Sequence, residues 1–183
     1  MARLRFVMDQ IREIEAARLT RLEQHPELAS HAMVRLLARV IGIGIETADM
    51  LVHEILSRNL RDRKAVARGA CPRAGQGPDP GAGLTGSPDE SGARRREKGL
   101  ARAGNARVRR GMIQLAWRFL MFQKNSALAQ WYRRQTADSR GTTRKTMIPA
   151  FARTALARKL LVALWQLVTT GEMPEGVVLR AAA

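Results

Sequence analysis

The segment LLARVIGIGIETADML, residues 36–51, contains the pattern that decides the fold class. Apolar residues at helical spacing lie on both sides of Gly42 and Gly44. Such a pattern predicts two short helices joined by a glycine turn. We expect these helices to run from His31 to Val40 and from about Ile45 to Ser57.

This glycine turn has the appearance of a helix-hairpin-helix motif. In that motif the backbone N–H groups of the hairpin, here at Gly42 and Gly44, face a DNA phosphate, and the following helix favours the anion. Glu46 lies in the first turn of the following helix and would compete with a phosphate. The alternative is a plain helical hairpin with glycine at its turn.

The residues before this segment predict one long amphipathic helix, from Ala2 to about Glu23, which His25-Pro26 ends. Its apolar residues keep the spacing of a narrow seam: Leu4, Val7, Ile11, Ile14 and Leu22. This seam fits a coiled coil or an arm packed on a partner helix, and the alternative is an ordinary surface helix. We therefore divide the chain into a coiled-coil-like helix, residues 1–27, and a domain over residues 28–183.

The rest of the chain also predicts helices. GACPRAGQGPDPGAGLTG, residues 69–86, reads as a flexible Gly/Pro-rich loop. Helical periodicity returns over 106–122, is extended by 126–135, and follows again over 153–169, after a polar loop at 138–145. No stretch shows period-two alternation, so the fold is expected to be mainly α. Trp117, Trp131 and Trp165 are expected in the core rather than as platforms for base stacking.

The charge of the chain indicates its class of partner. The 183 residues include 32 Lys and Arg against 16 Asp and Glu, a formal net charge of +16. Such a field favours polyanions, with nucleic acid first and an anionic membrane second. Most of the cations are arginine, which binds phosphate bidentately, so nucleic acid is favoured further.

Other features of the composition exclude several classes. The single cysteine, Cys71, excludes an internal disulfide framework, and the three histidines form no ligand motif. No secretory signal opens the chain, and the most apolar window, residues 156–168, is too short to span a bilayer. We expect a cytoplasmic protein with no membrane contact, no metal site and no cofactor in this chain.

Ser91 is the candidate nucleophile. It stands directly ahead of a cationic run that consists of Arg94, Arg95, Arg96 and Lys98. A serine hydroxyl needs a base or strong electrostatic help to attack, and in phosphoryl transfer positive charge supplies most of that help. A flexible serine loop feeding a cationic cluster would suit phosphodiester chemistry. The alternative is a solvated loop serine beside a surface charge run.

A second basic cluster follows at the expected start of a helix. It includes Asn105, Arg107, Arg109 and Arg110. These residues would follow a nucleic-acid backbone, with the helix N-terminus adding favourable potential. The alternative is a solvated cationic helix face.

Four segments resemble a known family. LLARVIGIGIETADML, GLTGSPDESG, REKGLARAGNARVRRGMIQLAW and ALARKLLVALW occur in the order found in the C-terminal domain of a bacterial insertion-sequence transposase family. Members of that family join an N-terminal nuclease-like domain with four carboxylates, through a coiled coil, to a serine-bearing domain. The resemblance covers almost the whole chain.

The resemblance implies a function and a set of partners. Ser91 matches the serine of the family's SG motif, which is proposed to attack DNA and form a covalent phosphoserine. The four carboxylates would bind a divalent metal, Mg²⁺, and complete a composite site with the serine of another subunit. The family works as an oligomer on DNA in the bacterial cytoplasm, at the nucleoid, and a structured guide RNA can direct it.

The chain also departs from the family pattern. It begins at the coiled coil, without the carboxylate domain, and it carries extra residues around 69–82 and near 149–154. Pro149 would interrupt a helix that the family keeps continuous. We expect a truncated transposase. The alternative is a catalytically inactive nucleic-acid-binding remnant that interferes with intact transposases by assembling with them.

Overall fold

The chain is mainly helical, as the sequence predicted. The computed structural model describes residues 2–58, 60, 62–67, 84, 86–91, 94–100, 105–137 and 147–181. Its helices are α1 (Ala2–Gln24), α2 (Ala29–Ala38), α3 (Ile45–Leu51), α4 (Arg63–Ala67), α5 (Ala106–Phe122), α6 (Ala127–Ala137) and α7 (Met147–Thr170), and a π-helical turn, η1 (Val52–Leu56), continues α3. The strands β1 (Gly86–Ser91) and β2 (Arg94–Leu100) form one antiparallel hairpin.

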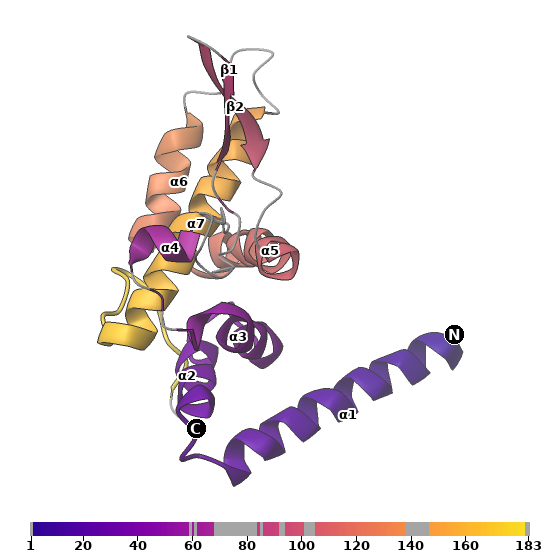
Figure 1. Ribbon diagram of the computed structural model, residues 1–183. Coiled ribbons are helices and arrows are strands. Elements are labelled where there is room, and N and C mark those ends of the chain that lie inside the picture. The colour runs from indigo at the N-terminus through magenta and orange to yellow at the C-terminus, as the bar shows by residue number, and fades with distance from the viewer. Residues whose placement is uncertain are drawn as a thin grey trace.

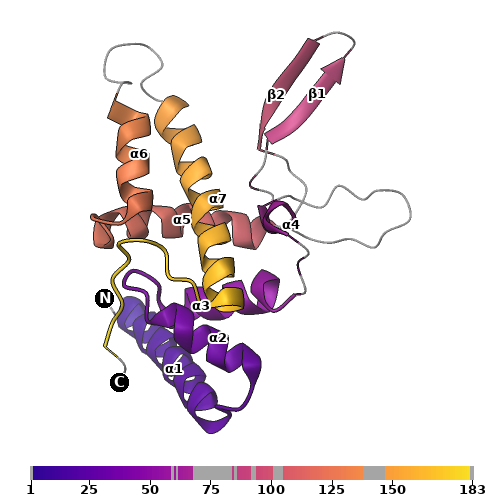
Figure 2. The same cartoon turned by 90° about the vertical axis from the view of Figure 1, so that its left-hand side faces the viewer.

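The long helix α7 is the centre of the fold. It contacts α2, α4, α5 and α6, and both views show it running through the body of the molecule (Figure 1, Figure 2). Its buried side chains include Leu156, Ala157, Leu160, Leu161, Leu164 and Leu167. They meet the buried face of α5, which consists of Val108, Met112, Leu115, Ala116 and Phe119. The periodicity of 106–122 therefore predicted this helix correctly.

The predicted helical hairpin around Gly42 is present, with shifted ends. Gly42 has a φ of 100°, a left-handed conformation that favours glycine. α2 ends at Ala38, short of the predicted Val40, because Val40 pairs with Leu179 in an isolated antiparallel bridge. The third helix begins at Ile45 as predicted and changes to a π-helical turn at Val52.

The buried side chain of Gln123 joins this turn to the C-terminal segment. Its Nε2 donates to the carbonyl oxygens of Ile41 and Val178, at 2.8 and 2.9 Å, and its Oε1 accepts from the Val178 N–H at 2.9 Å. Arg180 N–H also donates to Arg39 O at 2.7 Å. Gln123 is 1% exposed, and its buried amide finds hydrogen-bond partners in the backbone of both segments.

The prediction of a serine loop is wrong, and the structure contains two strands that the sequence did not indicate. Ser91 is the last residue of β1, and the cationic run forms β2. The strands GSPDES and RRREKGL contain almost no apolar residues, so no alternation of apolar and polar residues marked them. Their pairing instead sets acidic positions of β1 against basic positions of β2, which favours cross-strand pairing.

Helix α1 leaves the helical body as a long arm (Figure 1). Its predicted seam is exposed at Leu4, Val7, Ile11 and Ile14, by 49% to 62%, whereas Leu22 is 6% exposed. The guanidinium of Arg35 donates to Leu22 O at 3.1 Å and to Pro26 O at 2.9 Å, and so holds the connection to α2. The arm is thus tied at its C-terminal end, and most of its seam contacts no part of the described chain.

Three further predictions need correction. Residues 126–135 do not extend α5, because the chain turns at Gln123 and Ser126 Oγ accepts from Ala129 N–H at the start of α6. Pro149 does not interrupt α7, because it lies in the first turn, where N–H groups have no partner within the helix. Trp117 is not in the core: it is 48% exposed on α5, where Arg153 Cζ lies 4.7 Å from its ring centre.

Trp131 and Trp165 are partly buried against the core, as expected. The predicted loops at 69–82 and 138–145 lie outside the described residues.

Candidate nucleic-acid interface

The hairpin β1–β2 contains the candidate nucleophile and the cationic run. The register pairs Ser91 with Arg94, Glu90 with Arg95 and Asp89 with Arg96. Ser91 and Arg94 are therefore the last paired residues before the connection between the strands. The pairing brings the serine backbone directly opposite the first residue of the cationic run.

This arrangement differs chemically from a loop. Strand pairing fixes the backbone of Ser91 relative to the backbone of Arg94 and Arg95. Pro88 lies opposite Glu97, and a register shift separates Gly86 from Pro88. Lys98 lies in β2 within the shifted part of the register.

A second set of predicted residues meets at the start of α5. Asn105 precedes the helix, and its Oδ1 accepts from the N–H groups of Arg107 and Val108 at 2.9 and 3.2 Å. Its Nδ2 donates to Glu54 Oε2 at 2.6 Å, and Arg107 Nη1 pairs with Glu54 Oε1 at 3.2 Å. Asn105 therefore caps α5 and links it to η1, which satisfies the first N–H groups of the helix.

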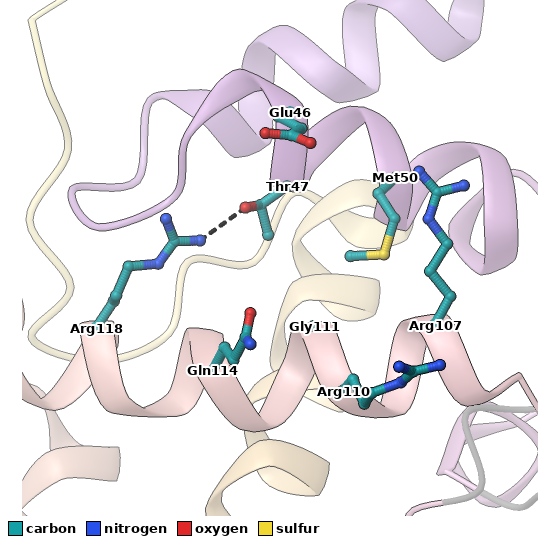
Figure 3. A pocket seen from close by; sticks show the side chains of 8 residues that line it. All are labelled: Glu46, Thr47, Met50, Arg107, Arg110, Gly111, Gln114 and Arg118. Atoms are coloured by element: carbon teal, nitrogen blue, oxygen red, sulfur yellow. Dashed lines mark hydrogen bonds between the residues drawn. The ribbon is translucent and has the colours of Figure 1, made fainter. Parts of the chain in front are cut away.

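A cleft lies between α3 and α5, as Figure 3 shows. It has a volume of about 610 Å³, and its lining is mostly polar or basic: Glu46, Thr47, Met50, Arg107, Arg110, Gly111, Gln114 and Arg118. Arg118 Nη2 donates to Thr47 Oγ1 at 2.7 Å across the cleft. Three arginines of one helix thus line a single opening.

The spacing of α5 explains this clustering. Arg107, Gly111, Gln114 and Arg118 recur at intervals of three or four residues, so they share one face of the helix. Gly111 lies next to the Met50 side chain of α3, since a Cβ there would lie 2.6 Å from Met50 Cε and the thioether would have to move. The polar residues of this face thus line the cleft on both sides of Gly111.

The glycine turn lies against the other end of α5. A Cβ at Gly42 would lie 3.4 Å from Phe122 Cβ, whereas a Cβ at Gly44 would meet nothing within 4 Å. Neither glycine N–H donates a hydrogen bond within the described part of the chain. Phosphate contact by Gly42 and Gly44 stays a prediction.

The structure thus divides the predicted site residues among three places. Ser91, Arg94, Arg95, Arg96 and Lys98 lie in the hairpin; Asn105, Arg107, Arg109 and Arg110 lie at the start of α5; Gly42 and Gly44 lie in the turn before α3. Arg107 and Arg110 share the cleft, and Arg109 does not line it.

Sequence reasoning missed Thr47, Gln114 and Arg118 in the cleft, and Glu54 beside it. For Gln114 and Arg118 a signal existed, because they continue the helical spacing that starts at Arg107. For Thr47 and Glu54 there was none, since only the packing of α3 and η1 on α5 brings them to this place.

Two structural findings concern the wider class of site. Among the described residues, no group of three or more His, Cys, Asp and Glu side chains lies close enough to hold a metal ion. Of the helices in the described ranges, none is both long and apolar enough to cross a membrane.

Comparisons with known proteins agree with the family resemblance of the sequence. The model of the transposase IS116/IS110/IS902 family matches residues 81–133, which include the hairpin and α5. The chain is also similar to "Putative transposase y4rJ" of Sinorhizobium fredii, with 36% identity over 187 aligned residues. The alignment covers 97% of this chain and 42% of that protein, so this chain spans less than half of the relative's length. No solved structure matches the chain.

Proposed function

We propose that this chain is the C-terminal part of an insertion-sequence transposase of the IS116/IS110/IS902 family, and that it acts in DNA transposition. The family match over 81–133 and the similarity to the Sinorhizobium fredii protein support this proposal. Ser91 is the proposed nucleophile for strand cleavage and exchange. The observation that carries the serine assignment is the register of the hairpin, which sets Ser91 opposite Arg94.

The proposed reaction is a pair of transesterifications. Ser91 Oγ attacks the phosphorus of a DNA phosphodiester, loses its proton and forms a phosphoserine, while the bond to the leaving deoxyribose oxygen breaks and that oxygen takes up a proton. A hydroxyl of another DNA end then attacks the phosphoserine and restores the serine. The number of phosphodiester bonds is conserved, so no external energy source is needed.

The basic residues of β2 have a defined part in this proposal. Arg94, Arg95 and Arg96 would stabilise the negative charge that develops on the phosphate oxygens, and Lys98 would add to the attraction. No step of the proposed reaction is assigned to a metal bound by this chain. Mg²⁺ would belong to carboxylates supplied by another domain.

We also propose partners for the wider surface. DNA is the first, since the formal net charge is +16 and the family match is to transposases. A structured guide RNA and further transposase subunits are proposed as well, the subunits through the exposed seam of α1. The nucleoid is the corresponding place of action.

A covalent-adduct assay tests the serine assignment. The whole chain is incubated with labelled element-end DNA and Mg²⁺, together with a transposase carboxylate domain supplied in trans, and the products are separated under denaturing conditions. We expect a labelled protein–DNA adduct with the parent chain and none with Ser91→Ala.

Ser87→Ala is the matched control, because it removes a hydroxyl from the same strand. It should leave the adduct in place. If the parent chain forms no adduct while a full-length transposase does so in the same reactions, the nucleophile assignment fails, and an inactive nucleic-acid-binding part that assembles with intact transposases is the better description.

A further inference from the structure

We infer that the cleft between α3 and α5 binds the phosphodiester backbone of a nucleic acid, with Arg110, Gln114 and Arg118 as its ligands. This inference rests on the proposed function for one point only, namely that the ligand is a nucleic acid. The site itself uses residues other than Ser91 and the hairpin, and it would hold a backbone segment that is bound but not cleaved.

The size and the walls of the cleft suit such a segment. The volume of about 610 Å³ lies within the range of ~300–1,000 Å³ that is usual for ligand sites. Thr47 and Met50 of α3 form one wall, and Arg110, Gln114 and Arg118 come from α5 opposite (Figure 3). The α5 wall thus offers hydrogen-bond donors, and the α3 wall offers a hydroxyl, a thioether and the carboxylate of Glu46.

The arginines have hydrogen-bonding capacity to spare. Within the described chain, Arg118 donates one hydrogen bond, to Thr47, and Arg110 donates one, from Nε to Ala106 O at 3.4 Å. A guanidinium carries five N–H donors. The Thr47 contact holds the Arg118 guanidinium over the cleft, so its remaining donors are positioned for phosphate oxygens before a ligand arrives.

Arg107 contributes less positive charge to the cleft than its position suggests. Its guanidinium pairs with Glu54 at 3.2 Å, and Glu54 also accepts from Asn105. This carboxylate offsets the charge of Arg107 at its end of the cleft. The uncompensated positive charge therefore lies toward Arg110 and Arg118.

Glu46 is the one carboxylate in the lining, and it opposes an anionic ligand. Arg18 of α1 lies with its Nη1 3.8 Å from Glu46 Oε1, and the Arg18 side chain is 29% exposed. This contact partly neutralises Glu46. The arm α1 thus contributes to the affinity of the cleft, although it supplies no lining residue.

The first test measures binding of the whole chain to a 20-bp DNA duplex and to an RNA duplex of the same sequence, over a series of salt concentrations. Arg110→Gln and Arg118→Gln should weaken binding, and each should reduce the slope of log K against log salt by about 0.9 for DNA, the value for one lost phosphate contact. The duplex whose binding these substitutions weaken more shows whether the bound backbone is that of DNA or of RNA.

Two controls separate this site from a general effect of charge. Arg134→Gln removes the same charge from α6, outside the cleft, and should leave the slope unchanged. Thr47→Val removes the hydrogen bond of Arg118 but keeps its charge, so it should weaken binding less than Arg118→Gln does. Equal slopes for Arg134→Gln and the two cleft variants would overturn the inference.

A double-mutant cycle tests the link to α1. Glu46→Gln should strengthen binding, and Arg18→Gln should weaken it in the parent chain but much less in the Glu46→Gln background. An Arg18→Gln effect of the same size in both backgrounds would overturn the role given to α1. None of these measurements involves strand cleavage, so the Ser91 assignment can fail while the cleft stands, and the cleft can fail while the Ser91 assignment stands.

Discussion

Single glycines determine how the C-terminal segment leaves α7. Gly171 and Gly176 have φ values of 75° and 70°, in the left-handed region where a side chain is strained. Their surroundings differ. A Cβ at Gly171 would meet nothing within 4 Å, whereas a Cβ at Gly176 would lie 2.9 Å from Asn125 O and 3.1 Å from Ser126 Cα.

Alanine substitutions at Gly171 and Gly176 separate two free-energy costs, that of a left-handed backbone and that of a close contact of the new Cβ. Gly171→Ala should lower the free energy of unfolding by about 1–2 kcal/mol, the cost of a left-handed alanine. Gly176→Ala should cost more, since backbone atoms must also move. Urea denaturation of both variants measures the difference, and equal losses would show that the contact at Gly176 relaxes without cost.

The exposed seam of α1 is an unusual feature at the scale of one element. Burying a large aliphatic side chain stabilises a protein by about 1.5–3 kcal/mol. The exposed residues of the seam do not provide this stabilisation. Arg35 fixes the base of the arm, and Arg18 pairs with Glu46 of α3. The seam is therefore held away from the core and is available for a second helix, as a coiled coil requires.

Self-association through α1 should depend on the seam and not on the rest of the helix. Ile11→Lys places a charge in the seam and should raise the dimer dissociation constant by tenfold or more, since about 1.4 kcal/mol corresponds to a factor of ten. Ala16→Lys, on the opposite face, should have little effect. Sedimentation velocity measures both, and identical behaviour of the two variants would contradict the coiled coil.

At the scale of the whole molecule, Gln123 joins three regions that are distant in sequence. Its amide connects the end of α5 to the turn at Ile41 and to the C-terminal segment at Val178. The bridge between Val40 and Leu179 adjoins this contact. Closing such long loops costs entropy, so the buried amide stabilises an arrangement that the local sequence does not favour.

Replacing this amide should destabilise the whole fold. Gln123→Leu keeps most of the volume but leaves Ile41 O and Val178 N–H without their side-chain partner, at about 1–3 kcal/mol for each buried group. Gln130→Leu is the control, because Gln130 is exposed and its Nε2 makes a single bond, to Asn125 O. Thermal unfolding followed by circular dichroism should show a clear loss for Gln123→Leu alone.

The helices were predictable because residues close together in the sequence mark them. The period of Val108, Met112 and Leu115 marks the buried face of α5, and Gly42 and Pro26 mark the turns that bound α2. The hairpin was not predictable in this way. Its strands contain almost no apolar residues, so their pattern looks like that of a solvated loop.

The candidate site shows the same division. The sequence by itself determined the basic character of the chain, the family resemblance, the mainly helical class and the arginines of α5, since these depend on composition, order and helical spacing. Only the tertiary structure decided that Ser91 faces Arg94, that Glu54 holds Asn105 and Arg107, and that Arg118 meets Thr47 across a cleft. The contacts of Glu54 and Arg118 join residues that are far apart along the chain, so only the packing of α3, η1 and α5 could bring them together.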